Sequence, residues 1–441
     1  MLADDTIVAL STAAGRSGVA VIRVSGPQTR FVLETISGQV GKPRMARLCA
    51  LKKGFDQEVL DQALCLYFPG PASFTGEDIA EFHVHGSRAV IAAVLDVITS
   101  ISDNIRLAQA GEFARRAFIN GKMNLAEIEG LADLIDSETE WQRRQALRMV
   151  TGELGRLAQG WREKLILSLA YLDAEIDFMD EGDVGEGWTK TANVGVEDTA
   201  REILQVLKSS RSGERIRDGL EVVILGPPNS GKSSLLNAFS QRDVSIVTEF
   251  AGTTRDLIEV RCDLEGLPVT IVDTAGFRES DDPIEAEGIK RAVERARDAD
   301  LIVSLKSVDS EAEWIENYNV ETIKVLTKTD LKAAVVEGHM SISTLTGCGI
   351  NELMAEICAR LKLQIGEEVP LIARARQKES LSSALNHLQH IISGSASNTH
   401  PATELMAEDV RQAIRALERL IGRVDVDDVL DRIFGRFCIG K

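Results

Sequence analysis

The stretch from Gly226 to Ser233 has the spacing G-x-x-x-x-G-K-S and constrains the fold more than any other part of the chain. Glycines at this spacing let successive backbone N–H groups turn inward around a polyphosphate. The apolar run Leu220–Leu225 before it predicts a buried strand, and Ser234–Phe239 after it predicts a helix whose N-terminus faces the anion. A chance glycine turn would lack these flanks, so the sequence predicts a phosphate-binding loop.

The side chains of this loop have predicted roles. We expect Lys232 to place its charge near the β- and γ-phosphates, and the Ser233 hydroxyl to bind Mg²⁺. Asn229 has two interpretations that the residues alone leave open: its amide oxygen ligates a monovalent cation, or it stabilises the turn as an Asx residue. The remaining members expected to contact nucleotide are Ser230, Gly231 and Ser234.

Three further motifs follow apolar, strand-like runs in the order typical of a GTPase. The residues in them that we expect to contact nucleotide are Asp273, Thr274, Ala275, Gly276, Thr327, Lys328, Asp330, Ser343, Thr344 and Leu345. The Asp273 carboxylate can hold the Mg²⁺ shell indirectly, and the Gly276 N–H can meet the γ-phosphate. One such motif alone is usually a surface turn, whereas the ordered set predicts a GTPase domain.

The motif Thr327–Asp330 indicates which base is bound. Asp330 can accept hydrogen bonds from the N1–H and the 2-amino group of guanine, and adenine offers neither donor. A buried carboxylate left without donors is costly, so this contact favours GTP over ATP. Lys328 can lay its alkyl stem along the base. Thr327 stands where guanine-binding motifs most often carry Asn, so we expect one contact to weaken.

The segment before Asp273 carries residues suited to hydrolysis. Thr254 can complete the Mg²⁺ shell when the γ-phosphate is present. Phosphoryl transfer also needs positive charge where the β–γ bridge breaks, and an arginine often supplies it. The backbone carbonyls of Thr248, Phe250 and Thr253, with Asn229, could instead form an oxygen cage for K⁺.

An acidic segment follows Gly276 and is predicted to be mobile without the γ-phosphate. Glu285 or Glu287 could orient the attacking water. Composition leaves both candidates open, because most acidic residues in such a segment are solvated loop charges.

Length and composition set further bounds. A chain of 441 residues is too long for one compact core, so about two to four domains are expected. The net charge of −18 repels phosphate backbones at long range, which predicts weak binding of nucleic acid by this chain alone. Six scattered cysteines without a C-x-x-C pair, an acidic start and no long apolar run favour a cytoplasmic protein without a membrane span.

The periodicity of the chain divides it into four stretches. Residues 1–120 mix strand and helix patterns, as in an α+β domain, and 121–218 are helical. Residues 219–368 alternate strands and helices, as a doubly wound P-loop domain requires, and 369–441 are helical again. We predict a multidomain chain with α+β, all-α and α/β parts, in which the GTPase domain is inserted into one discontinuous helical domain. Two separate bundles are disfavoured because the second flank is short, and Ser209–Gly219 is interpreted as a polar linker.

Motifs outside the GTPase set support a family resemblance. They are Asp5–Ala9, Arg16–Gly26, Phe68–Gly70, Ser73–Asp78, Gly111–Phe113, Arg116–Phe118, Ala132–Asp136 and Cys438–Lys441. With the GTPase motifs, they make the chain resemble the MnmE (TrmE) family of bacterial tRNA-modification GTPases over essentially its full length. The departures are Thr327 and Ser17, where the family often has Asn and Gly.

The resemblance implies a set of catalytic and metal-binding residues. By position, the K⁺ ligands are Asn229, Thr248, Phe250 and Thr253, and the Mg²⁺ ligands are Ser233 and Thr254. Glu285 matches the glutamate that positions hydrolytic water through a second water, and it joins Lys232, Asn229 and Thr254 in the implied catalytic set. The GTPase domain would be Ras-like.

The resemblance also implies a site for a reduced folate, as 5,10-methylene- or 5-formyl-tetrahydrofolate. Arg23, Glu81, Lys122 and the C-terminal Lys441 match it by position, which makes residues 1–120 a folate-type and dimerisation domain. The pterin N–H donors suit a glutamate, and the carboxylates of the glutamyl tail suit cationic side chains. Without the resemblance, these four residues would be ordinary surface and strand-flanking charges.

The function implied by the resemblance involves several partners. In the family, GTP and K⁺ bring two GTPase modules face to face within a homodimer. A flavin- and NADH-using partner, MnmG, joins it in a heterotetramer or larger complex that places an aminomethyl or carboxymethylaminomethyl group on C5 of the tRNA wobble uridine, with folate as one-carbon donor. The alternative is a regulatory GTPase bound to RNA or ribosomes, but the basic appendix or duplicated module usual there is not in this sequence.

Overall fold

The structure is a computed structural model, and its chain forms two compact units. It describes residues 5–54, 58–178, 187–240, 258–273, 295–311, 314, 319–332, 338–396, 402–424, 430, 433–435, 437 and 439–440. Unit one consists of residues 1–132, 155–162 and 415–441, and unit two consists of 133–154 and 163–414. Within the described residues, none of the helices is both long enough and apolar enough to span a bilayer.

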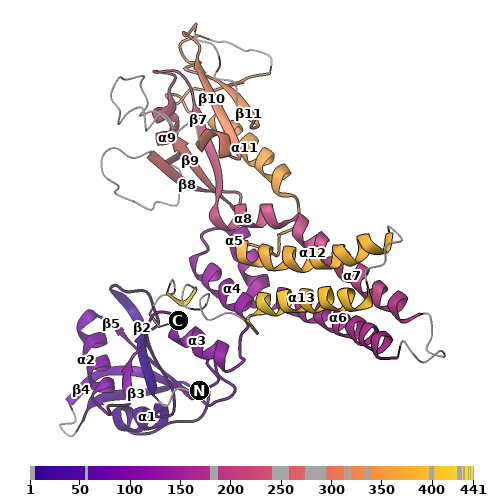
Figure 1. Ribbon diagram of the computed structural model, residues 1–441. Coiled ribbons are helices and arrows are strands. Elements are labelled where there is room, and N and C mark those ends of the chain that lie inside the picture. The colour runs from indigo at the N-terminus through magenta and orange to yellow at the C-terminus, as the bar shows by residue number, and fades with distance from the viewer. Residues whose placement is uncertain are drawn as a thin grey trace, which may run out of the picture. The chain divides into compact units, whose positions relative to one another are not determined.

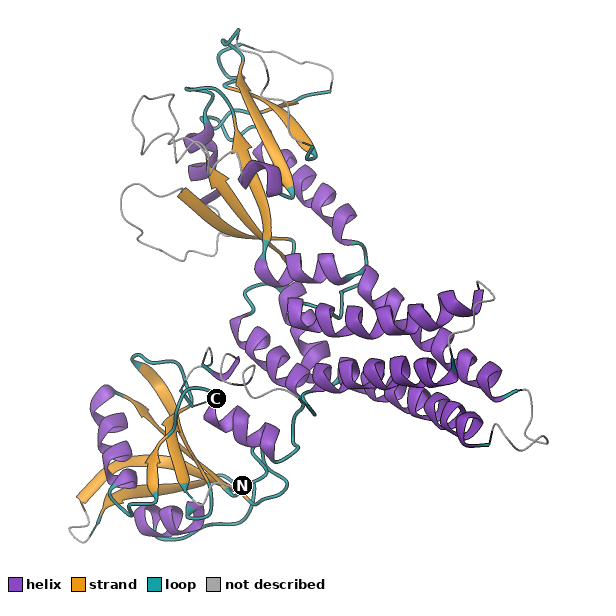
Figure 2. Cartoon of the chain, in the orientation of Figure 1, coloured by secondary structure: helices purple, strands orange, loops and turns teal. Residues whose placement is uncertain are grey.

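Unit one is built on a six-stranded sheet in the order β3-β4-β5-β2-β1-β6. Figure 2 draws the strands of both units in orange. Its strands are β1 (Thr6–Leu10), β2 (Ser17–Ser25), β3 (Arg47–Lys53), β4 (Glu58–Phe68), β5 (Ile79–Gly86) and β6 (Ile105–Leu107). All neighbours pair antiparallel except β1 and β6, which are parallel. The register places Arg23 of β2 opposite Glu81 of β5, so these two side chains share one face.

The two faces of this sheet differ in what covers them. Helices α1 (Thr29–Ser37) and α2 (Arg88–Thr99) contribute buried residues to one core with every second residue of β2, such as Ile22 and Val24. Strand residues alternate between faces, so the residue between them, Arg23, lies on the opposite face. There a smaller apolar cluster joins β1 to α3 (Glu112–Ile119) through Ile7 and Phe113.

Further helices follow along the chain. They are α4 (Leu125–Asp136), α5 (Glu140–Val150), α6 (Glu153–Asp177), α7 (Trp188–Lys208), α8 (Ser210–Asp218), α9 (Lys232–Ser240), α11 (Ile350–Ile365), α12 (Ala375–Ala396) and α13 (Thr403–Ile421). Near the chain end, Phe434 and Phe437 pack with Leu125 in unit one, and Ile439 forms a bridge with Ala110. Parts of the chain far apart in sequence therefore complete one core.

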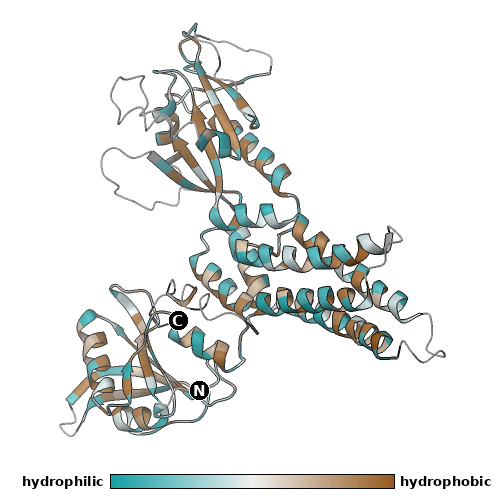
Figure 3. Cartoon of the chain, viewed as in Figure 1, coloured by the Kyte–Doolittle hydropathy of each residue, from teal (hydrophilic) through white to brown (hydrophobic). Residues whose placement is uncertain are grey.

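Unit two contains a second six-stranded sheet, in the order β12-β11-β10-β7-β9-β8 (Figure 1). Its strands are β7 (Leu220–Leu225), β8 (Ile258–Leu264), β9 (Leu267–Asp273), β10 (Leu301–Ser307), β11 (Thr322–Thr327) and β12 (Met340–Ser341). All pairs are parallel except β8 with β9. Separate apolar clusters lie on its two faces, which explains the mostly hydrophobic strands in Figure 3.

The polar stretch 209–219, interpreted from sequence as a linker, forms helix α8 instead. Ile216 of this helix is fully buried in the core of the second sheet. The Gln145 side chain of α5 donates hydrogen bonds of 3.2 Å to the carbonyl oxygens of Gly213 and Pro370. Helix α5 therefore contacts both the segment that enters the second sheet and the segment that leaves it.

Candidate functional site

The phosphate-binding loop lies between β7 and α9, with the strand and the helix that the sequence predicts. Asn229 has φ of 63° and Gly231 has φ of 93°, both in the left-handed region. A β-carbon added at Gly226 would lie 2.6 Å from the carbonyl oxygen of Leu305 in β10. The backbone thus turns tightly over the ends of two parallel strands, where doubly wound sheets bind ligands.

The Lys232 side chain folds back onto the phosphate-binding loop. Its Nζ donates to the carbonyl oxygens of Gly226 at 2.8 Å and Pro227 at 3.1 Å. Burial lowers the pKa of Lys232, and the nearby carboxylate of Asp273 opposes that change. A desolvated ammonium gains from an anionic partner, so Lys232 is well placed to attract phosphate oxygens.

Ser233 and Asp273 meet at a position suited to Mg²⁺. The Ser233 Oγ donates to Asp273 Oδ2 at 3.0 Å, and Asp273 at the end of β9 is 2% exposed. A hydroxyl and a carboxylate are the oxygen ligands that Mg²⁺ prefers, and bound substrate phosphates usually supply others. The donor set therefore fits the ion: Ser233 would hold it directly, with Asp273 behind.

The end of β11 is tied to the phosphate loop. Thr327 is buried, and its Oγ1 donates to the carbonyl oxygen of Ser230 at 2.6 Å. The hydroxyl in place of an amide therefore still links this segment to the loop. Ser343 Oγ donates to Asp330 Oδ1 at 2.5 Å, which fixes one oxygen of that carboxylate. Lys328 has a left-handed φ of 57° beside them.

The structure also places the other predicted nucleotide contacts that it describes. Ser234 is exposed in the first turn of α9. Ser343, Thr344 and Leu345 are consecutive, and the Leu345 side chain is 84% exposed. Predicted site residues that lie outside the described residues are Thr248, Phe250, Thr253, Thr254, Thr274, Ala275, Gly276, Glu285 and Lys441. The second water-orienting candidate, Glu287, lies outside them as well.

Two of the predicted folate residues are in direct contact in unit one. Arg23 donates to Glu81 Oε1 from Nε at 3.1 Å and from Nη2 at 2.9 Å. The other oxygen of Glu81 lies 3.3 Å from Nε2 of His83. Lys122 is exposed, and its stem lies against Gly76, where an added β-carbon would be 3.2 Å from Lys122 Cγ.

Sequence reasoning missed the aromatic side chains around this pair. The Arg23 guanidinium carbon lies 5.5 Å from the ring centroid of Phe74 and 5.8 Å from that of Phe113. Cation–π contacts of this kind hold a guanidinium in place. Both phenylalanines lie in stretches that carry the family resemblance, but the sequence assigned no role to them.

Comparisons with known proteins agree with this arrangement. The family model described as "MnmE helical domain" matches residues 125–438, and that described as "GTP-binding protein TrmE N-terminus" matches residues 6–122. A protein of Parvibaculum lavamentivorans named "tRNA modification GTPase MnmE" is 49% identical, with 99% of this chain and 100% of that protein covered. Proteins of the same name from Azorhizobium caulinodans and Beijerinckia indica are 48% and 46% identical, with 99% of this chain and 99% and 96% of theirs covered.

These matches extend over both units, and the second unit carries the nucleotide-site geometry described above. The matched regions include an N-terminal TrmE domain and a helical domain, and the phosphate-binding loop marks the GTPase domain. The chain therefore belongs to the MnmE family of tRNA modification GTPases.

Proposed function

We propose that this protein is a K⁺-activated GTPase that drives folate-dependent modification of C5 of the wobble uridine in tRNA. The observation that carries the GTPase part is the convergence of Lys232, Ser233 and Asp273 at the phosphate-binding loop. Lys232 neutralises charge on the β- and γ-phosphates, and Ser233 holds Mg²⁺ with Thr254. Asp330 selects guanine.

K⁺ is proposed to take the place of an arginine finger. Its ligands would be the Asn229 side chain and the carbonyls of Thr248, Phe250 and Thr253. The place of Asn229 in the turn of the phosphate-binding loop supports this role; its left-handed φ of 63° is one that asparagine adopts more readily than most residues other than glycine. Glu285 would position the hydrolytic water.

A reduced folate is the proposed one-carbon donor, bound in unit one. The Arg23–Glu81 pair supports this, since it offers a carboxylate for pterin N–H donors and a guanidinium for tail carboxylates. Lys122 and Lys441 would add positive charge for the tail. The product would carry an aminomethyl or carboxymethylaminomethyl group.

The proposed working form is a cytoplasmic homodimer joined by an FAD- and NADH-using protein like MnmG. The net charge of −18 supports a partner that carries the tRNA, because the chain alone repels phosphate backbones. We also propose the domain limits 1–120, 121–218, 219–368 and 369–441, with a Ras-like GTPase domain inserted into a discontinuous helical domain.

Mass spectrometry of wobble-position nucleosides tests this function. Cells that lack the protein should lose the C5-modified uridine and regain it with the unsubstituted gene. Cells given a ¹³C-labelled precursor of methylene-tetrahydrofolate should carry the label at the C5 substituent. Unchanged wobble uridines in the deletion strain would instead favour a regulatory GTPase bound to RNA or ribosomes.

A further inference from the structure

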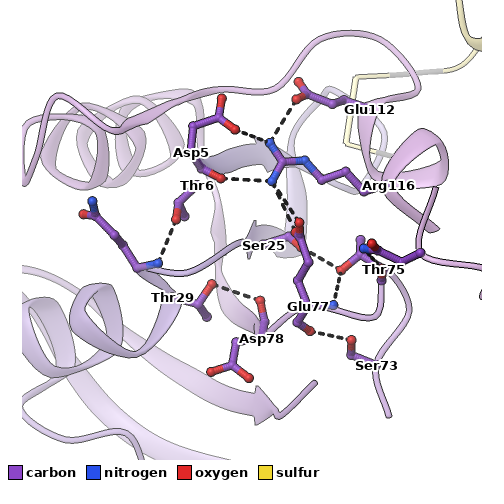
Figure 4. A network of polar contacts seen from close by, with 12 residues as sticks. Asp5, Thr6, Ser25, Thr29, Ser73, Thr75, Glu77, Asp78, Glu112 and Arg116 are labelled. Carbon is purple, nitrogen blue, oxygen red and sulfur yellow. Dashed lines mark hydrogen bonds and ion pairs between the residues drawn. The ribbon is translucent and has the colours of Figure 1, made fainter. Parts of the chain in front are cut away.

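Stretches that carry the family resemblance, residues 73–78, 111–113 and 116–118, meet at the side chain of Arg116. This arginine belongs to α3 and is 5% exposed. Its Nη2 donates to Asp5 Oδ1 at 2.8 Å and to Glu112 Oε1 at 3.1 Å, and its Nη1 donates to Glu77 Oε1 at 3.2 Å (Figure 4). One buried guanidinium therefore joins the start of β1, helix α3 and the loop that carries Glu77.

The loop 73–78 is held at more than one point. Glu77 Oε2 accepts from Ser25 Oγ of β2 at 2.7 Å, and that hydroxyl lies 2.7 Å from Thr75 Oγ1 (Figure 4). Asn120, just after α3, donates to the carbonyl oxygen of Thr75 at 2.7 Å. The loop therefore has one preferred position relative to both the sheet and α3.

The same two elements shape the surroundings of the proposed folate residues. The loop contributes Phe74 and α3 contributes Phe113, and both rings lie within 6 Å of the Arg23 guanidinium carbon. The loop also places Gly76 against the stem of Lys122. A shift of the loop relative to α3 would therefore move the neighbours of both cationic side chains.

We propose that Arg116 is a positioning residue of the folate site, which acts through Glu77 to hold the loop 73–78 against Arg23 and Lys122. The inference rests on the proposed function. A buried ion pair gives little net stability compared with apolar packing. The contribution that we assign to this one is to fix the relative position of the groups it joins. Arg116 does not contact Arg23 or Lys122 itself; its effect on a bound folate is transmitted by the loop.

The test measures binding of 5-formyl-tetrahydrofolate to the full-length chain by isothermal titration calorimetry. Arg116→Lys keeps the charge but loses the planar fork that spans three carboxylates. It should weaken binding about tenfold, a loss of the size expected when one charged hydrogen bond is removed. Arg106 provides the matched control, because it pairs with Asp5 and Glu112 but not with Glu77. Arg106→Lys should change affinity less than twofold.

A double-substitution cycle separates positioning from general destabilisation. Lys122→Ala should weaken folate binding in the parent chain and should weaken it distinctly less in the Arg116→Lys background, since the lysine is then already misplaced. A purely structural role for Arg116 would leave the two effects additive. Glu77→Gln removes the same link from the loop side, so it replaces Arg116→Lys in the cycle if that variant does not fold.

The outcomes for the two proposals can be told apart. Parent-like folate affinity of Arg116→Lys and Glu77→Gln, or strict additivity with Lys122→Ala, would overturn the role of Arg116 and leave the folate site intact. A parent chain that takes up no 5-formyl-tetrahydrofolate would overturn the folate site itself, and the role of Arg116 with it.

Discussion

At the scale of single residues, Thr327 joins the segment 327–330, which is proposed to bind the base, to the phosphate loop. Its hydroxyl reaches the Ser230 carbonyl at 2.6 Å, and both residues are buried. A threonine lacks the amide that an asparagine would present to the base. It therefore keeps the link between the two segments, and in the proposed function the discrimination of guanine falls to Asp330.

Thr327→Val should weaken GDP and GTP binding about tenfold. Valine matches the shape of threonine but leaves the buried Ser230 carbonyl without its donor, at a cost of about 1–3 kcal/mol. Titration with a fluorescent guanine nucleotide measures the change. Thr327→Ser keeps the hydroxyl and serves as the control. Equal affinities of the valine and serine variants would show that this hydrogen bond does not hold the loop.

At the scale of elements, helix α8 packs closely against the segment around Ile372, by which the chain leaves the second sheet. A β-carbon added at Gly213 would lie 1.7 Å from the carbonyl oxygen of Ile372, which is backbone and cannot turn aside. Asp133 also accepts from Arg217 and Arg374, which lie on the entering and leaving segments. Asp133 therefore holds together the segment by which the chain enters the second sheet and the segment by which it leaves.

Gly213→Ala should lower the free energy of unfolding by about 1–3 kcal/mol, because the added methyl group forces the backbone of α8 away from Ile372. Urea denaturation followed by circular dichroism measures the loss. Gly160→Ala in α6 is the matched control, since nothing lies within 4 Å of its added β-carbon. Alanine there should stabilise by up to about 1 kcal/mol. Similar losses in both variants would contradict the close approach.

Acid should loosen the attachment of α3. Burial raises the pKa of Glu112, but hydrogen bonds from Arg106, the Gln109 amide and Arg116 outweigh burial and hold it below its usual value. A depressed pKa contributes stability that is present above the unfolded-state value and is lost as pH falls through the folded-state value. Glu112→Gln should therefore lower the urea midpoint at pH 7 and flatten its decline toward pH 3. A decline as steep as that of the parent would assign the acid sensitivity to other groups.

At the scale of the whole molecule, the sequence predicted features whose residues are close together in the chain better than contacts between residues far apart in it. The phosphate loop was predictable because its strand, loop and helix are contiguous between residues 220 and 240. The contact of Arg23 with Glu81 spans 58 residues, and that of Arg116 with Asp5 spans 111. Only the strand register and the docking of α3 bring these pairs together, so no local pattern indicates them.

Helix α8 shows a second limit of sequence reasoning. Its polar composition predicted a linker, because polarity alone does not separate an exposed coil from a helix that buries one face, here through Ser210, Gly213 and Ile216. The family resemblance named the folate residues without showing what holds them. The proposed domain limits and the metal ligands between Thr248 and Thr254 stay predictions.

Potassium-dependent pairing of the two GTPase modules is the prediction that concerns the whole molecule. If K⁺ at Asn229 completes the site only when the two modules of the proposed homodimer meet, turnover in KCl should exceed turnover in NaCl at equal ionic strength, and turnover per molecule in KCl should fall where dilution separates the homodimer. Asn229→Ala should abolish the difference between the two salts with only a modest loss of GTP affinity, because Lys232 and its contacts with the loop backbone remain.

Phosphate release measured across a hundredfold range of protein concentration, beside sedimentation of the same samples, provides the readout. Glu285→Ala separates assembly from chemistry: it should associate in KCl as the parent does and lose most turnover, since the ion would still join the modules while the water is no longer oriented. Turnover per molecule that is independent of concentration in KCl, in samples that sediment as monomers, would show that one module hydrolyses GTP without a second.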